Sequence, residues 1–458
     1  IKKRQDDFRD QLPSLRAVKT NESFVFGAFK VEFFMVSHNI PASLGLVIHT
    51  PMGILVHTGD FKFDLTPSGS SPTELFKIAA LGDKNVLALI ADSTNAGHSG
   101  YQTSEAEIAR SLKDVIKSAP GRLIIGTFAS LLGRIQQIIW IAEELGKKVI
   151  VQGFSLRTNL EIAQELGYVK AQKGTIITEW KEAKHIPDEK QLIICTGAQG
   201  EERAALMRIA NKEHRDISIQ QDDTVVFSSS VIPGNERTVQ RLKDSLYRQG
   251  AIVVHYQMMD VHAGGHAKEE DLRWLIKLVN PRYHIPCEGH HSFLRLHAKI
   301  AESMGIPKEN IFVSDNGQVI EFSRVGTTVV GKLTNERVPA DPVMIDGIGA
   351  GNVDQVVLRD RQMLSEDGMI VIIATVRGKT GQLVGNPDII SRGFVHLKES
   401  KELIEQVRKR AKQLLMDKDP RSPAFEAYIK QKLRDDLGQF IFQKTERRPM
   451  ILPVVIEV

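Results

Sequence analysis

Cysteine is nearly absent from this chain, which holds only Cys195 and Cys287. The two lie far apart in the sequence and do not form a Cys-x-x-Cys pair. A framework of disulfides is therefore not expected, and so low a cysteine content is typical of proteins in a reducing, cytoplasmic compartment.

Long apolar runs and a strong charge of one sign are also missing. No stretch approaches the ~18 uninterrupted apolar residues that a membrane-spanning helix needs, and no secretory signal opens the chain. The net charge is only +4, so any contact with nucleic acid has to be a local groove rather than a general attraction to polyanions. The 458 residues, 42% apolar and 25% charged, are enough for two or three globular domains.

Strand-like apolar runs alternate with amphipathic helical runs through most of the chain. This rhythm predicts an α/β fold in which a parallel sheet is built with right-handed crossovers. The strands expected in the first half lie at 24–36, 44–49, 53–57, 86–90, 122–126, 148–151, 191–195 and 224–227, and the helices between them at 104–117, 131–145 and 158–166.

The alternation of strands and helices is interrupted near residues 338–342, where Pro339 and Pro342 flank Ala340 and Asp341. We interpret this segment as a linker to a further domain. The elements expected beyond it are a strand at 369–376, a helix with Leu403, Val407, Ala411 and Leu414 on one face, a second helix capped by Ser422 and Pro423, and a final strand at 451–458.

Two expected strands end on a single side chain of the kind that binds metal ions. His38 follows the apolar run 31–36, and Asp60 follows the run 53–57. A ligand at the point where a strand passes into a turn is held rigidly at the edge of the sheet. Metal-dependent hydrolases bind their ions at such positions. Either residue alone would more often be an ordinary polar group at the rim.

In each of three segments, an expected strand is followed by a few small polar residues and then by an expected helix. They are 126–130, 227–230 with 233–235, and 262–266. In a parallel sheet these loops would open at one edge, where the free N–H groups at the helix starts attract phosphate. Gly264 and Gly265 would let the backbone approach a phosphate closely.

Eight segments in order resemble the ribonuclease J family, a branch of the metallo-β-lactamase superfamily that carries a β-CASP insertion. The segments read SHNIPASLG, HTGDFKFD, ADSTNA, GTFAS, CTGAQGE, FSSSVIPGNE, VHAGGHA and RRPMILPVVIEV. The resemblance implies an α/β fold made of a metallo-β-lactamase αββα sandwich, an inserted β-CASP α/β domain and a small C-terminal α/β domain. The implied boundaries are 1–103 and 271–338 for the metallo-β-lactamase domain, 104–270 for the β-CASP domain, 339–345 for the linker and 346–458 for the C-terminal assembly domain.

The resemblance also assigns roles to single residues. It implies metal ligation by His38, Asp60 and Glu288 and catalytic roles for Asp60 and His266, and Asp92 matches the acidic motif of the β-CASP group. Lys62 would contact the RNA backbone or be solvated. The residues implied to hold the nucleotide are Ser130, Leu131, Leu132, His262, Ala263, Gly264, Gly265 and His266.

The chain departs from the family pattern in three places. The His-x-His-x-Asp-His motif occurs nowhere in it. We expect that the start of the metallo-β-lactamase domain is missing and that the chain alone is inactive; a naturally shortened protein is the alternative. Leu131 and Gly133 replace polar residues of the family's Ser-Asn-x-His segment. Glu288 replaces the family's Pro-x-His-Gly histidine, so either Glu288 is the ligand, or His290 or His291 takes its place, or the site has lost a metal.

The implied function is metal-dependent hydrolysis of RNA phosphodiesters, as a 5′-to-3′ exonuclease with endonuclease activity in RNA maturation and decay. The implied cofactor is a pair of zinc ions, with manganese or magnesium as substitutes. The implied partners are single-stranded RNA with a 5′-monophosphate, further copies in a homodimer or homotetramer, a paralogue, and an RNA-degradation complex, with no membrane. The alternatives are a catalytically silent RNA-binding or assembly subunit and a related β-CASP endonuclease.

Overall fold

The computed structural model describes residues 16–458 except 68–70, 233, 343–344, 347–348, 351–354, 378–379, 381, 395–400 and 417–424. The expected helix cap at Ser422 and Pro423 lies outside the described residues. Contacts within the chain divide it into two compact units, one made of residues 14–340 and one that contains residues 341–458.

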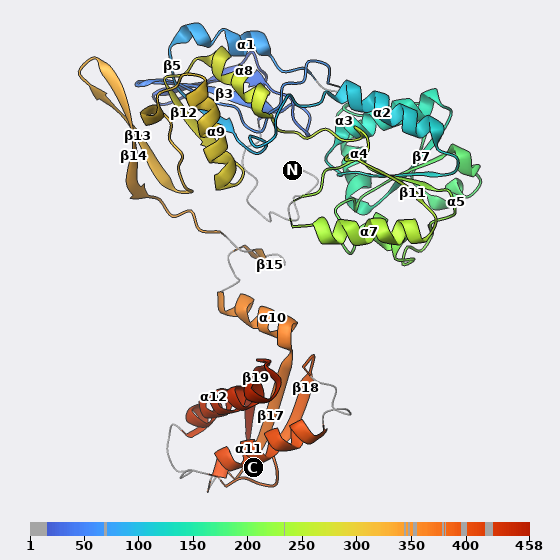
Figure 1. Ribbon diagram of the computed structural model, residues 1–458, viewed down its shortest axis with the longest axis vertical. Helices are drawn as coiled ribbons and strands as arrows, with labels where there is room; N and C mark the ends of the chain where they lie inside the picture. The colour runs from blue at the N-terminus through green and yellow to red at the C-terminus, as the bar shows by residue number, and fades with distance from the viewer. Residues whose placement is uncertain are drawn as a thin grey trace. The chain divides into compact units, whose positions relative to one another are not determined.

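The first sheet has six strands in the order β1-β2-β3-β4-β5-β12 (Figure 1). β2 and β4 are both antiparallel to β3, whereas β4, β5 and β12 are parallel to one another. The carboxyl ends of β2, β4, β5 and β12 therefore lie at the same edge. The strands are β1 (Ser23–Phe26), β2 (Phe29–Met35), β3 (Leu44–Thr50), β4 (Gly53–His57), β5 (Val86–Asp92) and β12 (Tyr283–Cys287).

The two faces of this sheet are covered differently. Helices pack on one face, where Val56, Leu89 and Leu275 belong to one buried core. On the other face a hairpin packs against Tyr283, whose ring lies 5.4 Å from that of Phe322. The covering elements are α1 (Leu75–Ala79), α8 (Glu269–Val279), α9 (His291–Ser303), and the hairpin strands β13 (Gln318–Val325) and β14 (Thr328–Arg337), with short 3-10 turns at Gly82–Lys84 and Lys308–Asn310.

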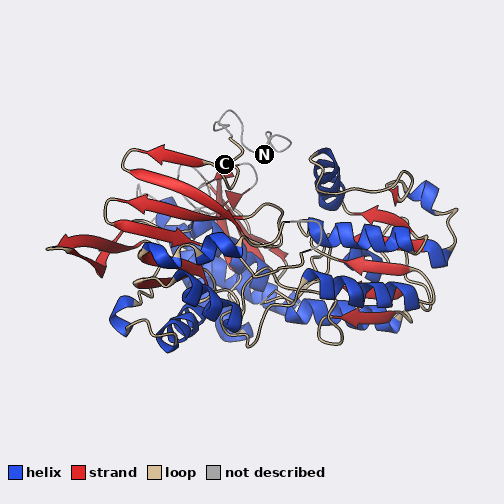
Figure 2. Ribbon diagram, turned by 90° about the horizontal axis from the view of Figure 1, so that it is seen from above, coloured by secondary structure: helices blue, strands red, loops and turns tan. Residues whose placement is uncertain are grey.

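The second sheet is wholly parallel, with the order β11-β10-β6-β9-β7-β8. Helices cover both of its faces, with α2 and α3 on one side and α7 on the other (Figures 1 and 2). The α/β fold with a parallel sheet is therefore confirmed. Its strands are β6 (Leu123–Gly126), β7 (Lys148–Gln152), β8 (Ile176–Ile177), β9 (Gln191–Cys195), β10 (Thr224–Phe227) and β11 (Ile252–His255). Its helices are α2 (Glu105–Ser118), α3 (Leu132–Glu144), α4 (Phe154–Glu165), α5 (Trp180–Ala183), α6 (Ala205–Ala210) and α7 (Glu236–Arg248), with a 3-10 turn at Asp188–Lys190.

Two expected elements differ from the structure. The single strand expected at 24–36 is a hairpin, because Gly27 adopts φ 59° in a turn between β1 and β2. The helix expected at 158–166 begins one turn earlier, directly after Gly153, whose φ of 111° ends the preceding strand.

The C-terminal unit is a three-stranded sheet in the order β18-β17-β19 with two helices packed on it. Val407 and Leu437 are fully buried in its core. Its elements are β15 (Ile345–Asp346), β16 (Gly349–Ala350), α10 (Gln355–Asp367), β17 (Met369–Val376), β18 (Asp388–Arg392), α11 (Lys401–Met416), α12 (Phe425–Thr445) and β19 (Met450–Glu457). Among the described residues of the whole chain, no helix is both long and apolar enough to cross a membrane.

Candidate functional site

Five side chains gather at the edge where β2, β4, β5 and β12 end. His38 follows β2, Asp60 follows β4, Asp92 ends β5 and Glu288 follows β12. His266 comes from the segment that returns from the second sheet. We call His38, Asp60, Asp92, His266 and Glu288 the carboxylate–histidine cluster. The ligand atoms of His38, Asp60 and His266 lie within 4.8 Å of one another, and so do those of Asp60, Asp92 and Glu288.

The His38 ring is held in one orientation by a backbone group. Its Nδ1 lies 2.9 Å from the carbonyl oxygen of Gly265, and because a carbonyl can only accept, Nδ1 is the donor. Nε2 is then the nitrogen with the free lone pair, and it lies 3.5 Å from Asp60. Burial lowers the pKa of His38, so the ring is neutral near pH 7 and suited to ligation.

The His266 ring is held by Asp92, whose carboxylate lies 2.6 Å from Nδ1. Burial by itself lowers the pKa of His266, but the hydrogen bond to Asp92 and the charges of Asp92 and Asp60 reverse the effect and raise it. The pKa values of His38 and His266 are therefore shifted in opposite directions. The two rings stand edge to face with their centroids 5.0 Å apart.

Asp60 and Glu288 form a hydrogen-bonded pair of carboxyl groups. The hydrogen bond to Glu288 lowers the pKa of Asp60, whereas partial burial, the same bond and the charges of Asp60 and Asp92 raise the pKa of Glu288 to about 8. Two carboxyl groups this close require a shared proton or a cation between them. Glu288 also adopts φ 61°, a backbone conformation that is uncommon for a residue other than glycine.

The alternatives to Glu288 lie elsewhere. Neither His290 nor His291 joins any group of close ligand atoms among the described residues. His291 is half exposed and lies 3.7 Å from Asp315. Cys287 and His57 do form a group with Glu288, but burial and the nearby carboxylates raise the pKa of the Cys287 thiol well above neutral, which makes it a poor ligand.

The donor set of the cluster fits a divalent metal ion. Imidazole nitrogens and carboxylate oxygens suit zinc and manganese. The close approach of the Asp60 and Glu288 carboxyl groups marks the place where a cation would relieve the repulsion of two acids. His38 presents its lone pair toward Asp60, and the side chain of Asp60 is 45% exposed and open to an incoming ion.

The residues expected to hold a nucleotide are placed in different surroundings. Ser130 is exposed, whereas Leu131 and Ala263 are 3% and 2% exposed, so these two could contact a nucleotide only through their backbone. Burial and the charge of Arg134 lower the pKa of His262 to about 3, which keeps the ring neutral. Leu132, adjoining Leu131, is only partly buried and packs against the core of the second sheet.

Gly264 and Gly265 each lie close to a protein side chain. A Cβ on Gly265 would stand 2.6 Å from Nδ1 of His38, and one on Gly264 would stand 2.8 Å from the amide nitrogen of Gln102. The second expected phosphate loop is also occupied, since the Ser228 hydroxyl, which is fully buried, donates to the carbonyl of Val261 at 2.8 Å.

A buried ion network links the segment after Asp60 to the second sheet. Arg134, which is 1% exposed, donates through Nη2 to Glu105 at 2.7 Å and through Nη1 to Ser228 at 2.7 Å. Lys62 lies 3.0 Å from Glu105 and 3.5 Å from Asp64. Burial by itself raises the pKa of Glu105, but Arg134 and Lys62 lower it to about 2.

Lys62 therefore neither contacts RNA nor is solvated, because it is 1% exposed and paired with two carboxylates. The ion network of Lys62, Asp64, Glu105 and Arg134 was not found from the sequence. Its paired residues lie 2, 29 and 43 positions apart in the chain, and a charged residue in a helix is usually solvated.

Comparison with known proteins agrees with this architecture. The family model "Ribonuclease J, beta-CASP domain" matches residues 120–246, and "Ribonuclease J C-terminal domain" matches residues 356–458. The chain is 38% identical over 444 residues to Ribonuclease J2 of Bacillus subtilis, an alignment that covers 97% of this chain and 79% of that protein. It is 39% identical to Ribonuclease J 1 of Streptococcus pyogenes, covering 96% and 77%, and 40% identical to Ribonuclease J of Thermus thermophilus, covering 94% and 72%.

The fold and the cluster define a hydrolase of the metallo-β-lactamase type with an inserted β-CASP domain. Within that class, the chain belongs to the ribonuclease J family, whose members are metal-dependent ribonucleases.

Proposed function

We propose that this chain provides the metal-dependent RNA-hydrolysing centre of a ribonuclease that acts as a 5′-to-3′ exonuclease and also cuts internally, in RNA maturation and decay. The observation that carries the proposal is the convergence of three carboxylates and two imidazoles at one edge of the first sheet. The substrate would be single-stranded RNA with a 5′-monophosphate.

His38, Asp60 and Glu288 would hold the metal ion, and zinc suits these donors, with manganese or magnesium as substitutes and two ions in the complete site. A bound divalent ion polarises a phosphoryl oxygen and makes a water molecule more acidic. The chain's own residues supply the rest. His266, whose pKa the hydrogen bond to Asp92 raises, would donate a proton to the leaving oxygen.

The substrate phosphate would lie beside the segment 262–266 and Ser130, which is an exposed residue. Neutral His262 would contribute a hydrogen bond rather than a charge. The domain limits that this proposal uses are 1–103 with 271–338, 104–270 and 346–458. They are supported by the two separate sheets and by the match of residues 120–246 to the β-CASP family model.

A second candidate is a catalytically silent subunit that binds RNA or assembles with a paralogue. The observations that favour it are the carboxylate at Glu288 in place of a histidine and the buried, apolar Leu131 in place of a polar residue. Assembly as a homodimer or homotetramer through the C-terminal unit is part of both candidates. The unpaired Cys195 and Cys287 support a cytoplasmic location for either one.

The test compares the whole gene product with its Asp60→Ala variant on 5′-monophosphorylated RNA in the presence of Zn²⁺ or Mn²⁺. We expect hydrolysis to fall by at least about a hundredfold in the variant, because Asp60 contacts both halves of the cluster, with RNA affinity largely unchanged. The control is Asp315→Ala at an exposed carboxylate outside the cluster. A wild-type protein that binds RNA but does not cut it would support the silent subunit instead.

A further inference from the structure

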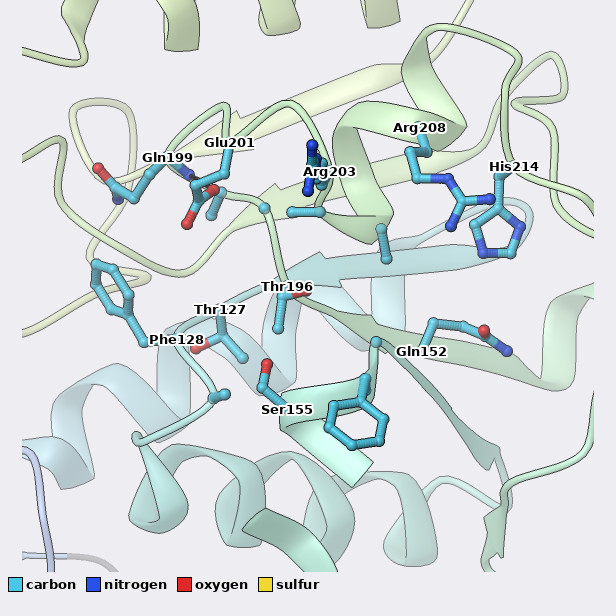
Figure 3. A pocket seen from close by; sticks show the side chains of 17 residues that line it. Thr127, Phe128, Gln152, Ser155, Thr196, Gln199, Glu201, Arg203, Arg208 and His214 are labelled. Atoms are coloured by element: carbon cyan, nitrogen blue, oxygen red, sulfur yellow. Dashed lines mark hydrogen bonds between the residues drawn. The ribbon is translucent and has the colours of Figure 1, made fainter. Parts of the chain in front are cut away.

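A cleft of about 600 Å³ lies in the second sheet at the carboxyl ends of β6, β7 and β9 (Figure 3). It shares no residue with the carboxylate–histidine cluster. Its volume is in the range of small-molecule sites. Among the side chains that line it are Thr127, Phe128, Ser155, Thr196, Arg203 and Arg208.

The cleft occupies the place where parallel sheets bind ligands. β6 is followed by α3 on one face of the sheet, whereas its neighbour β9 is followed by α6 on the opposite face. The two loops separate at this point and leave a crevice outside the strand ends. Residues 196–199 and 201, from the segment CTGAQGE, form one wall. The hydrolytic site does not use this segment.

The cleft carries cations that the protein does not neutralise. Among the residues that the structure describes, the side chain of Arg203 makes no hydrogen bond or ion pair. The Arg208 guanidinium makes one hydrogen bond, to the carbonyl oxygen of Glu213 at 3.4 Å, and its charge lowers the pKa of the neighbouring His214. The one acidic side chain in the lining, Glu201, accepts the backbone N–H of Gln199 at 3.2 Å. In Figure 3 Arg203 and Arg208 stand on the same side of the cleft, facing Thr127 and Ser155 across it.

Two further donors lack partners at this site. α4 begins at Phe154 with Gly153 as its N-cap, so no side chain satisfies the first N–H groups of this twelve-residue helix. Gln152 is only 5% exposed, and its amide Nε2 has no partner among the described residues. Figure 3 shows Gln152 in the lining below Arg208 and His214. A buried donor left unpaired beside unpaired cations indicates an anionic ligand.

Aromatic side chains in the lining favour a nucleotide over a bare anion. Phe154 is 88% exposed, so its ring is free to stack on a base. Phe128 lies edge to face with His262, with ring centroids 6.4 Å apart. Bases stack on such rings, and each stacked base contributes about 1–3 kcal/mol to the binding free energy in proteins that bind single-stranded nucleic acid.

We propose that this cleft is a second nucleotide site that binds a nucleoside monophosphate unit, separate from the hydrolytic cluster. Arg203, Arg208 and the first N–H groups of α4 hold the phosphate, and Phe128 or Phe154 packs against the base. The unit is either a free mononucleotide or one nucleotide of a bound RNA, since both present the same phosphate and base.

The first experiment titrates AMP into the metal-free chain in EDTA by isothermal calorimetry. The AMP dissociation constant should rise at least about tenfold in Arg203→Ala and in Arg208→Ala, the scale of one hydrogen bond to a charged group. The matched control is Arg215→Ala, an exposed arginine of the same domain that pairs with Asp216 and does not line the cleft. Thermal unfolding of each variant checks that the fold is kept.

The second experiment separates the two sources by measuring binding of a twelve-nucleotide oligoadenylate to the same variants. If the RNA occupies the cleft, both arginine variants weaken oligoadenylate binding as much as they weaken AMP binding. If only free nucleotide occupies it, AMP binding falls and oligoadenylate binding is unchanged.

The proposal is overturned if wild-type chain binds neither AMP nor oligoadenylate, or if both arginine variants bind both ligands with wild-type affinity. Its failure is distinct from that of the proposed hydrolysis. Asp60→Ala should leave the AMP affinity unchanged, and Arg203→Ala should leave the metal affinity of the cluster unchanged.

Discussion

Glu288 combines an unusual backbone with an unusual charge. Its φ of 61° places the side chain back over the sheet edge toward Asp60, and Gly289 continues the turn with φ 79°. With Asp92 and Asp60 it brings three carboxylates to one site. A cation is the natural partner of such a group, because each acid raises the cost of ionising the others.

Replacing Glu288 should therefore change metal binding before it changes the fold. We expect Glu288→Ala to lower the affinity for Mn²⁺, measured by isothermal calorimetry, by about tenfold or more, the scale seen when supporting groups of a metal site are lost. Glu288→His should restore most of the affinity, since imidazole is also a good ligand.

The control for this measurement is His291→Ala, which removes a nearby imidazole outside the cluster. Glu288 would not be a ligand if its alanine variant kept the full affinity, and a loss in His291→Ala instead would move the role to that histidine.

Residues at the ends of strands were the part of the site that the sequence could predict. His38 and Asp60 stand out because each follows an apolar run and is followed by a turn. The partners that orient them could not be predicted, because the bond from His38 to Gly265 joins residues 227 positions apart. No local pattern encodes such a contact, and it depends on how the two sheets meet.

At the scale of elements, the ion network joins the start of α2 to the start of α3. Glu105 stands at the first position of α2, Arg134 lies in the first turn of α3, and Lys62 follows β4. The network has two positive and two negative members, so it is neutral as a whole. Removal of one member leaves a buried charge without compensation, which costs more than the pair itself contributes.

Glu105→Gln should show this cost with a defined pH dependence. The carboxylate has a pKa of about 2 in the folded chain and 4.5 as its ordinary value. Because the folded value is the lower one, its ionisation stabilises the fold fully above pH 4.5, and this stabilisation is lost as the pH falls toward 2. The ionisation of Glu105 therefore contributes about 3 kcal/mol to the free energy of unfolding, at 1.36 kcal/mol per pKa unit.

The measurement is the free energy of unfolding in urea for wild type and Glu105→Gln between pH 6 and pH 3. The difference between the two should be largest at pH 6 and should narrow below pH 4.5. Glu213→Gln, at an exposed carboxylate outside the network, should differ from wild type by less than about 0.5 kcal/mol throughout. A difference that stays constant with pH would contradict the paired state of Glu105.

Elements with a clear apolar period were predicted to within a residue or two, as β6 and β9 show. The exceptions have local causes that periodicity does not report. Gly27 turns the chain inside one apolar run, and Gly153 allows α4 to start at Phe154. The hairpin of β13 and β14 covers the far face of the first sheet and was not predicted either, because its pattern alternates only weakly.

At the scale of the whole molecule, the C-terminal unit has a core of its own. Val407, Ala411 and Leu437 are fully buried, and the described residues of this core all lie at position 370 or beyond. A domain with a closed core is expected to fold by itself.

The fragment 341–458 should accordingly unfold cooperatively on heating, as followed by circular dichroism. Leu437→Ala in the fragment should lower its stability by about 2–5 kcal/mol, because it opens a cavity in the core. A broad, gradual transition in the unmutated fragment would show that the core needs the rest of the chain.

The order of strands in the first sheet has a consequence for how the protein is made. β5 and β12 are neighbours, yet the whole of the second sheet is synthesised between them. The second sheet is continuous in sequence, so it can fold on the ribosome while the first sheet still lacks its last strand. His266 and Glu288 emerge after it, and only their arrival completes the cluster. A nascent chain therefore carries a folded nucleotide-sized cleft well before it carries a hydrolytic centre.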